Sequence, residues 1–244
     1  MIYVSLTTIP SRVKNINKTI ESLLNQRKQP DKIFINLPST YKRFNENINE
    51  EEIKHINNNK VIEIVRCEDF GPGTKLLGSL DKFDKNSLLI LVDDDHIYEN
   101  FMIEKFYYFY SKAPENAYSF YVHPLKNFGV GQGADGFAIN SNFLGGVKKF
   151  YNEIVQNNKD LFIHDDLWVS FFLFFIKKVK ILSLQSYLTK TSENRFSTIY
   201  KKHDNSDGLI SSYGKNINEA IYNRDKIAIK SLDYMFKKTK DIKF

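Results

Sequence analysis

Five consecutive apolar residues, Leu88 to Val92, run directly into three aspartates, Asp93, Asp94 and Asp95. A strand with apolar residues at every position has both faces buried, so this run predicts a central strand of a mostly parallel sheet. Three adjacent carboxylates at the end of such a strand repel one another, and their burial is unfavourable unless a cation compensates. The junction therefore predicts both the kind of sheet and the position of a site.

The remaining apolar periodicities place strands and helices in alternation along the chain. Short apolar or β-branched runs predict further strands at residues 2–7, 32–37, 61–65, 118–122 and 179–182. Helical spacing predicts helices at residues 13–24, 50–56, 74–80, 102–110, 147–155, 167–177 and 216–238, and a glycine-dense loop is expected at 129–136. This order predicts a single α/β domain with a central, mostly parallel sheet flanked by helices. In such sheets ligands bind beyond the carboxyl ends of the strands.

Composition limits what the chain does. Its 244 residues are 42% hydrophobic and 14% aromatic, which suffices for a packed domain and argues against disorder. The net charge of +6 comes from scattered lysines rather than a dense basic stripe, so we interpret it as solvated surface and expect no nucleic-acid partner. The one cysteine, Cys67, excludes an internal disulfide and a cysteine-rich zinc site, and we interpret it as structural.

Two features of the sequence predict the cellular location of the protein. Residues 1–6 enter a strand-like run without a basic region or a small-residue cleavage site, so no signal peptide is expected. The most apolar later segment, residues 167–176, is about half as long as the roughly 20 residues of a membrane-spanning helix. We therefore predict a soluble, cytoplasmic protein without a transmembrane segment, and leave open a peripheral contact with a membrane surface.

The acidic triplet is a predicted metal site. Side chains two residues apart in an extended chain share a side, so Asp93 and Asp95 are expected to address one ion and Asp94 to point elsewhere. Mg²⁺ or Mn²⁺ would take such carboxylates and complete its shell with water and diphosphate oxygens. The alternative is an acidic turn that caps the following helix, although a single cap does not require three acids.

The pattern of a hydrophobic strand followed by Asp-X-Asp resembles the metal-binding motif of GT-A fold glycosyltransferases. Four further segments resemble that family in order along most of the chain. They are a first strand and nucleotide-contacting loop at 5–12, a lysine-bearing segment of small bacterial and virus-encoded members at 69–76, an acceptor-side glycine loop at 133–137 and an acidic pair at 164–168. The resemblance implies a single GT-A-like (Rossmann-like) domain, a nucleotide-sugar donor, a saccharide or glycan acceptor and a Mn²⁺ or Mg²⁺ cofactor.

Donor contacts are expected in the first two of these segments. The loop after the first strand would hydrogen-bond the nucleobase or ribose, and an ordinary turn with a surface arginine is the alternative. Lys75 would add a point charge to a helix N-terminus whose amide groups attract phosphate, and a solvated lysine in a turn is the alternative. The predicted donor-binding residues are Thr7, Thr8, Arg12, Lys75, Asp93 and Asp94.

The acidic pair supplies the predicted catalytic base. Asp166 matches the second acid of the family's pair and begins a helix rich in aromatic residues. Partial burial there is expected to raise its pKa, which suits a group that accepts a proton from a sugar hydroxyl. Asp165 is the substitute, and N-capping of the helix is the alternative for both. We interpret Trp168, in the same helix, as a core residue.

One late histidine is a predicted metal ligand. The resemblance implies that a histidine completes the metal shell in some GT-A enzymes, which makes His203 a ligand together with Asp93 and Asp95. A surface histidine is the alternative, because His203 has no fixed spacing to the triplet. His96 and His123 are given no role.

The sequence thus predicts a glycosyltransferase of the hexosyltransferase type that moves a sugar from a UDP-sugar to a hydroxyl acceptor with inversion. Residues 1–98 are predicted to bind the donor, residues 99–214 to bind the acceptor and carry catalysis, and residues 215–244 to form a C-terminal helix. A non-catalytic nucleotide-sugar-binding domain is one alternative. A phosphotransfer enzyme of the haloacid dehalogenase type is another, although that family places its acids after the first strand rather than the fourth.

Overall fold

The structure, a computed structural model, describes residues 1–54, 56, 59–187, 196–199, 213–214, 217–240, 242 and 244. Its strands are β1 (Ile2–Thr7), β2 (Lys32–Pro38), β3 (Ile62–Cys67), β4 (Leu88–Leu91), β5 (His96–Ile97), β6 (Ala117–Ser119), β7 (Val122–Leu125), β8 (Phe128–Gly131), β9 (Phe137–Asn140), β10 (Ile181–Ser183) and β11 (Ser197–Thr198). Its α-helices are α1 (Asn17–Leu24), α2 (Glu50–Ile53), α3 (Thr74–Leu77), α4 (Met102–Lys112), α5 (Val147–Phe150), α6 (Lys159–Phe162), α7 (Asp165–Phe171) and α8 (Ile217–Thr239).

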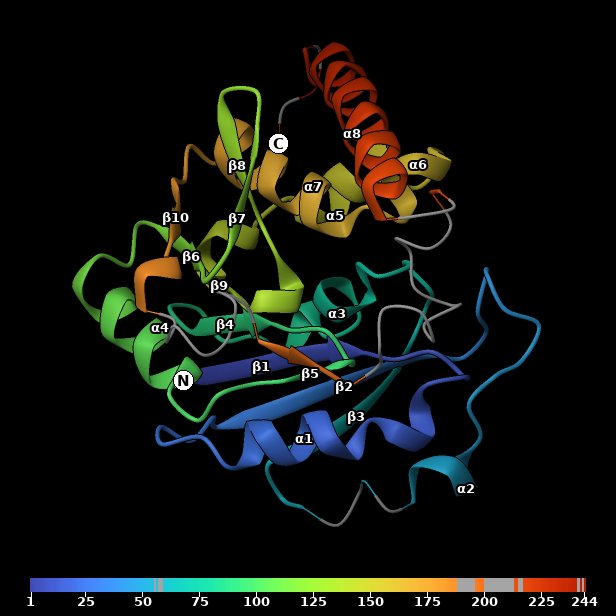
Figure 1. Ribbon diagram of the computed structural model, residues 1–244, viewed down its shortest axis with the longest axis vertical. Helices are drawn as coiled ribbons and strands as arrows, with labels where there is room; N and C mark the ends of the chain where they lie inside the picture. Colours follow the sequence, from blue (N-terminus) through green and yellow to red (C-terminus); the bar gives the residue numbers. More distant parts are fainter. Residues whose placement is uncertain are drawn as a thin grey trace.

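Seven of these strands form the central sheet, in the order β10-β6-β9-β4-β1-β2-β3 (Figure 1). Strands β4, β1, β2 and β3 are parallel, as are β6 and β10, whereas β9 runs antiparallel to its neighbours β4 and β6. Strands β7 and β8 form a separate antiparallel hairpin, and β5 pairs with β11. The predicted α/β class and the mostly parallel sheet are therefore confirmed.

Strand β4 lies inside the sheet between β1 and β9, as its uniformly apolar sequence predicts. Leu88 and Ile90 pack into one core, while Leu89 and Leu91 pack into the other. All four side chains are at most 2% exposed. Because alternate side chains of a strand point to opposite faces, a run without polar positions requires cover on both sides. That cover fixes the acidic triplet at the carboxyl end of an interior strand.

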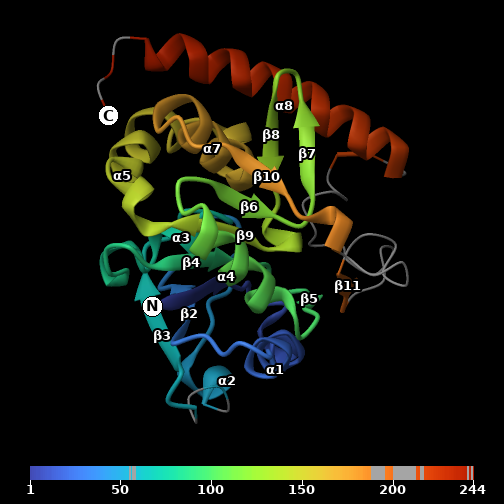
Figure 2. The same cartoon turned by 90° about the vertical axis from the view of Figure 1, so that its left-hand side faces the viewer.

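Helices cover both faces of the sheet (Figures 1 and 2). On one face, α1 and α4 contribute Ile20 and Phe106 to the core that contains Ile90. On the other face, α3 and α5 contribute Leu76 and Phe150 to the second core. Helices α1 and α4 present an apolar stripe to the sheet and a polar face to solvent, as amphipathic helices on an α/β sheet do, whereas every residue of α3 is buried.

Helix α8 packs beyond the sheet, against α6, the segment after α5 and the hairpin β7–β8 (Figure 2). Its buried face includes Leu232 and Met235. The ion pair from Lys126 Nζ to Asp233 Oδ1, at 2.9 Å, joins the hairpin to the exposed side of α8. Among the described residues, no helix combines the length and the apolarity needed to cross a membrane.

Several predicted elements differ from the observed ones. The predicted helix at 13–24 begins as a 3₁₀ turn, Val13–Asn15, before α1, and the helices predicted at 147–155 and 167–177 end in π-helical turns, Tyr151–Val155 and Phe172–Ile176. The single strand predicted at 118–122 is wrong, since the chain leaves the sheet after β6 and enters the hairpin as β7. The glycine loop predicted at 129–136 is wrong in its first part, which is strand β8. Gly131 serves close packing there, because a Cβ would lie 2.6 Å from the Phe137 ring.

Replacing Ile90 by alanine is expected to lower the free energy of unfolding by about 2–5 kcal/mol, because the cavity would lie in an interior strand with little freedom to collapse. Chemical denaturation monitored by circular dichroism measures the change. Ile229→Ala is the matched control, since Ile229 is 38% exposed on α8, and its effect should stay within about 0.5 kcal/mol. Equal effects of the two substitutions would contradict the central position of β4.

Candidate functional site

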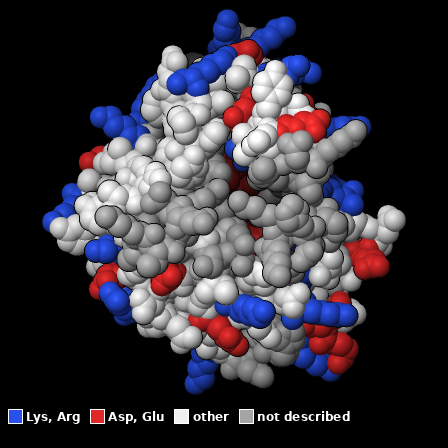
Figure 3. Space-filling view, viewed as in Figure 1, with Lys and Arg blue, Asp and Glu red and all other residues white. Residues whose placement is uncertain are grey.

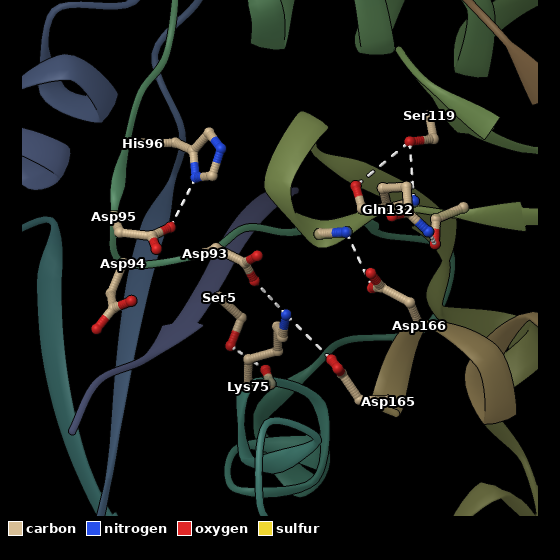
Figure 4. Close-up of polar contacts among 12 residues, drawn as sticks. Ser5, Lys75, Asp93, Asp94, Asp95, His96, Ser119, Gln132, Asp165 and Asp166 are labelled. Atoms are coloured by element: carbon tan, nitrogen blue, oxygen red, sulfur yellow. Dashed lines mark hydrogen bonds and ion pairs between the residues drawn. The ribbon is translucent and has the colours of Figure 1, made fainter. Parts of the chain in front are cut away.

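The acidic triplet lies where the chain leaves β4 and turns into β5. One carboxylate oxygen each of Asp93 and Asp95 and one ring nitrogen of His96 lie within 4.8 Å of one another. Figure 4 shows these side chains at the end of the strand. The two carboxylates predicted to address one ion are therefore neighbours, and the turn adds an imidazole beside them.

Asp94 points away from that group toward the loop after β1 (Figure 4). Its Oδ2 accepts a hydrogen bond from Thr8 Oγ1 at 2.5 Å, and its Oδ1 accepts one from Arg12 Nη1 at 2.9 Å. The same Arg12 nitrogen donates to Asp95 Oδ2 at 3.1 Å, while Thr7 donates to a backbone carbonyl of β2 at 2.8 Å. Thr8 and Arg12 thus hold the acids in place, and their contact with a nucleoside stays a prediction.

Lys75, in α3, is a buried cation that joins two groups of acids. Its Nζ forms ion pairs with Asp93 Oδ1 and, at 3.0 Å, with Asp165 Oδ2, and its side chain is 5% exposed. Burial by itself would lower the pKa of Lys75, but the negative charges of Asp165, Asp93 and Asp166 outweigh burial and raise it well above its ordinary value. Lys75 therefore stays charged and ties the end of β4 to the start of α7.

Asp166 faces the same cluster from α7. Its Oδ1 accepts a hydrogen bond from the backbone N–H of Gly133 at 2.9 Å (Figure 4). A Cβ at position 133 would lie 2.6 Å from Lys75 Nζ and 2.9 Å from Asp93 Oδ1, so a side chain there would displace the ends of these two residues. Burial, followed by the charge of Asp165, raises the pKa of Asp166 well above its usual value. This is the direction that a carboxylate acting as a base near neutral pH requires.

N-capping does not account for the acidic pair. The N-cap position of α7 is His164, and Asp165 and Asp166 follow it in the first turn. Asp165 forms an ion pair with Lys75 in α3, and Asp166 accepts a hydrogen bond from Gly133, which follows β8. Trp168, one turn further on, is fully buried, which confirms its interpretation as core.

His96 was missed by the sequence analysis. Its Nδ1 lies 2.7 Å from Asp95 Oδ1. Burial lowers the pKa of His96, but its hydrogen bond to Asp95 and the charge of that carboxylate outweigh burial and raise it. In turn, burial raises the pKa of Asp95, whereas the bond and charge of His96 and the charge of Arg12 hold it at about 2. Direct adjacency to the acids was the available signal. His203, the predicted histidine ligand, lies outside the described residues.

The donor set of Asp93, Asp95 and His96 fits a divalent metal ion. Carboxylate oxygens suit Mg²⁺ and Mn²⁺, and an imidazole nitrogen is a further acceptable ligand. The Asp93 side chain is 32% exposed, so this group is open to water or to ligand oxygens. Figure 3 shows basic and acidic side chains interspersed around the edge of one face.

Cys67 lies at the end of β3 and is half-buried. Burial, with a smaller contribution from the charge of Asp69, raises the pKa of the Cys67 thiol to about 12. The thiolate is the nucleophilic form of cysteine, so a thiol held neutral is inert. This environment is consistent with the structural interpretation.

No protein-family profile and no curated protein matches the sequence. Solved structures do match. The mannosyltransferase PcManGT from Pyrobaculum calidifontis, solved with GDP-Man and Mn²⁺, aligns with a TM-score of 0.57 and 9% identity over 97% of this chain and 73% of that chain. S. aureus TarS 1–349, solved with UDP-GlcNAc, aligns with a TM-score of 0.52 and 12% identity over 97% of this chain and 72% of that chain.

At these identities the similarity defines the fold alone. The chain has a GT-A-like α/β fold, with a mixed, mostly parallel seven-stranded sheet flanked by helices. The fold that the sequence predicted is therefore confirmed. The acidic cluster after β4 is DXD-like in sequence, and in the structure it groups Asp93 with Asp95.

His164, directly before the acidic pair, is a neutral histidine in a partly buried position. Its Nε2 lies 3.0 Å from the hydroxyl of Tyr213, and the two rings stack with centroids 5.5 Å apart. Burial, followed by the positive charge of Arg224, lowers the pKa of His164 to about 4.

Replacing His164 by glutamine is expected to weaken the pH dependence of stability. An unfolded histidine has a pKa of about 6.5, so between about pH 6.5 and 4 the unfolded chain binds a proton that the folded chain does not. The free energy of unfolding of the wild type therefore falls as the pH falls through this window, by about 2–3 kcal/mol from this group. Urea denaturation of both proteins at pH 7 and pH 4.5 measures the difference. An equally steep fall in His164→Gln would contradict the assignment.

Proposed function

We propose that this protein is a metal-dependent glycosyltransferase that moves a hexosyl group from a UDP-sugar to a hydroxyl acceptor with inversion of the anomeric centre. The observation that carries the proposal is the meeting of two acidic groups across Lys75. Asp93 and Asp95 come from the end of β4, and Asp165 and Asp166 come from the start of α7. The GT-A-like structures of PcManGT and TarS hold GDP-Man and UDP-GlcNAc, which are both nucleoside diphosphate sugars.

Asp93, Asp95 and His96 would hold Mn²⁺ or Mg²⁺, and Mn²⁺ is present in the PcManGT structure. When bound, the ion supplies positive charge against the negative charge that develops on the departing diphosphate. Arg12 fixes the orientation of Asp95 through its hydrogen bond to Oδ2. A role for His203 in the same shell stays a prediction.

The chain's own residues would then bind the donor beside this group. Lys75 places a fixed positive charge next to Asp93, where the leaving diphosphate would lie. Such a preorganised charge is effective because the Lys75 side chain is only 5% exposed. The residues proposed for donor binding are Thr7, Thr8, Arg12, Lys75, Asp93 and Asp94.

Asp166 would act as the base. It would take the proton of the acceptor hydroxyl as the acceptor oxygen bonds to the anomeric carbon and the bond from that carbon to UDP breaks. A single displacement of this kind inverts the anomeric centre. Asp165, which pairs with Lys75 at 3.0 Å, is the substitute base and keeps the lysine in position.

The proposed roles divide the chain into a donor-binding part, an acceptor-binding and catalytic part, and a C-terminal helix. Residues 1–98 are proposed to bind the donor, residues 99–214 to bind the acceptor and supply the base, and residues 215–244 to provide the C-terminal helix. A cytoplasmic location stays a prediction from the sequence.

UDP is expected to raise the melting temperature only when Mn²⁺ is present, because the diphosphate would bind through the ion. Asp93→Asn and Asp95→Asn should each raise the UDP concentration needed for this stabilisation at least tenfold, since each removes a charged ligand of the ion. Thermal-shift titration measures it, with exposed Asp81→Asn as the control. Stabilisation by UDP without any divalent ion would contradict the proposed metal dependence.

Asp166→Asn is expected to lower the rate of UDP release from a UDP-sugar by about 10²–10⁴-fold, because the amide cannot accept a proton. Binding of UDP with Mn²⁺ should be retained. In the wild type the rate should rise with pH through a pKa well above the usual carboxyl value, as the raised pKa of Asp166 requires. Metal-dependent binding without turnover of any nucleotide sugar in the wild type would instead indicate a non-catalytic binding domain.

A further inference from the structure

A small cavity lies next to Asp166. It has a volume of about 70 Å³ and opens between the hairpin β7–β8, the start of α7 and helix α8. A water molecule occupies about 30 Å³ in the liquid, so the cavity has room for a group of a few heavy atoms. Its position beside the proposed base makes it a place where part of an acceptor can lie, and this inference rests on the proposed function.

The polar wall of the cavity includes residues of the hairpin and of α8, in addition to His164 and Asp166 at the start of α7. His123 belongs to β7, Gln132 follows β8, and Arg224 and Asp225 belong to α8. Asp225 Oδ1 lies 3.3 Å from His123 Nε2 and 3.6 Å from Arg224 Nη2. The carboxylate of Asp225 thus lies between the hairpin and α8 at the edge of the cavity.

The charges in this wall favour an uncharged occupant. The guanidinium of Arg224 already faces Asp225, and Asp166 places a second acid in the wall. His164, which also lines the cavity, is neutral near pH 7 because burial lowers its pKa to about 4. An anionic group would approach the carboxylate of Asp225 and would find the charge of Arg224 already compensated, whereas hydroxyl or amide groups find both donors and acceptors.

The remaining wall is apolar. Leu125, Leu167 and Ala228 contribute aliphatic surface from the hairpin, α7 and α8. A pyranose substituent carries C–H groups next to hydroxyl or amide groups, so a mixed wall of this kind matches it. The cavity size fits a small substituent such as a hydroxymethyl or N-acetyl group.

We propose that this cavity is an acceptor subsite for a neutral sugar. A small uncharged substituent of the acceptor enters between hairpin β7–β8 and α8, and this places a neighbouring hydroxyl against Asp166. Arg224 and Asp225 act as specificity-determining residues that hydrogen-bond the substituent, and α8 closes the subsite.

Saturation-transfer difference NMR tests this subsite with a set of methyl glycosides. The set contains methyl glucoside, galactoside, mannoside and N-acetylglucosaminide, with methyl glucuronide as the charged comparison, in the presence of UDP and Mn²⁺. At least one neutral glycoside is expected to give a signal that exceeds the glucuronide signal. Ala228→Phe should reduce that signal at least fivefold, because the ring would fill the cavity from α8. Ile229→Phe, at the exposed neighbouring position, should leave it unchanged.

Circular dichroism establishes whether Ala228→Phe is folded, and Arg224→Gln serves as a second variant that should weaken the same signal. The subsite is wrong if no neutral glycoside gives a signal, if the glucuronide is preferred, or if the folded cavity variants bind as the wild type does. Thermal shift by UDP with Mn²⁺ should be equal in all variants. Its absence in the wild type would overturn the proposed donor site, while the glycoside signals would still decide the subsite.

Discussion

The ion pairs of one buried lysine hold the site together. Lys75 is 5% exposed and lies between Asp93, at the end of β4, and Asp165, at the start of α7. A buried charge is tolerated only when it is paired, and removing a partner leaves the remaining charge uncompensated in a medium of low polarity. The lysine therefore fixes how the end of the sheet faces the helical layer, and the arrangement of the other acids follows from it.

Around this lysine the acids are separated into two environments. Arg12 and His96 stabilise the charged form of Asp95, whose pKa is held at about 2, while burial and the charge of Asp165 raise the pKa of Asp166 well above its usual value. A carboxylate that stays ionised suits a metal ligand, and one that takes up a proton readily suits a base. Pairs of groups whose environments push their pKa values apart are typical of acid–base sites.

Much of the fold followed from local sequence patterns. The apolar run before Asp93 predicted a strand with both faces covered. This prediction was correct because the hydrophobic pattern of a strand depends only on the alternation of its side chains between two faces. Strand β8 was not predictable, since its glycines suggested a loop. Gly131 pairs with Val122 in the hairpin, and the Phe137 ring of a different strand packs against its backbone. The break between β6 and β7 likewise depends on where the hairpin packs rather than on local propensity.

For the site, the sequence by itself determined the chemical groups and their order: three carboxylates after an interior strand, a lysine after a glycine turn, and a second acidic pair before an aromatic helix. The tertiary structure decided their partners. Thr8 and Arg12 bond Asp94, His96 joins Asp93 and Asp95, and Gly133 bonds Asp166. Most of these contacts join residues that are distant in the chain, and His96 reaches the two acids through the turn after β4. Hydrophobic alternation is a property of neighbouring residues, whereas electrostatic pairing depends on distances that only the packed domain sets.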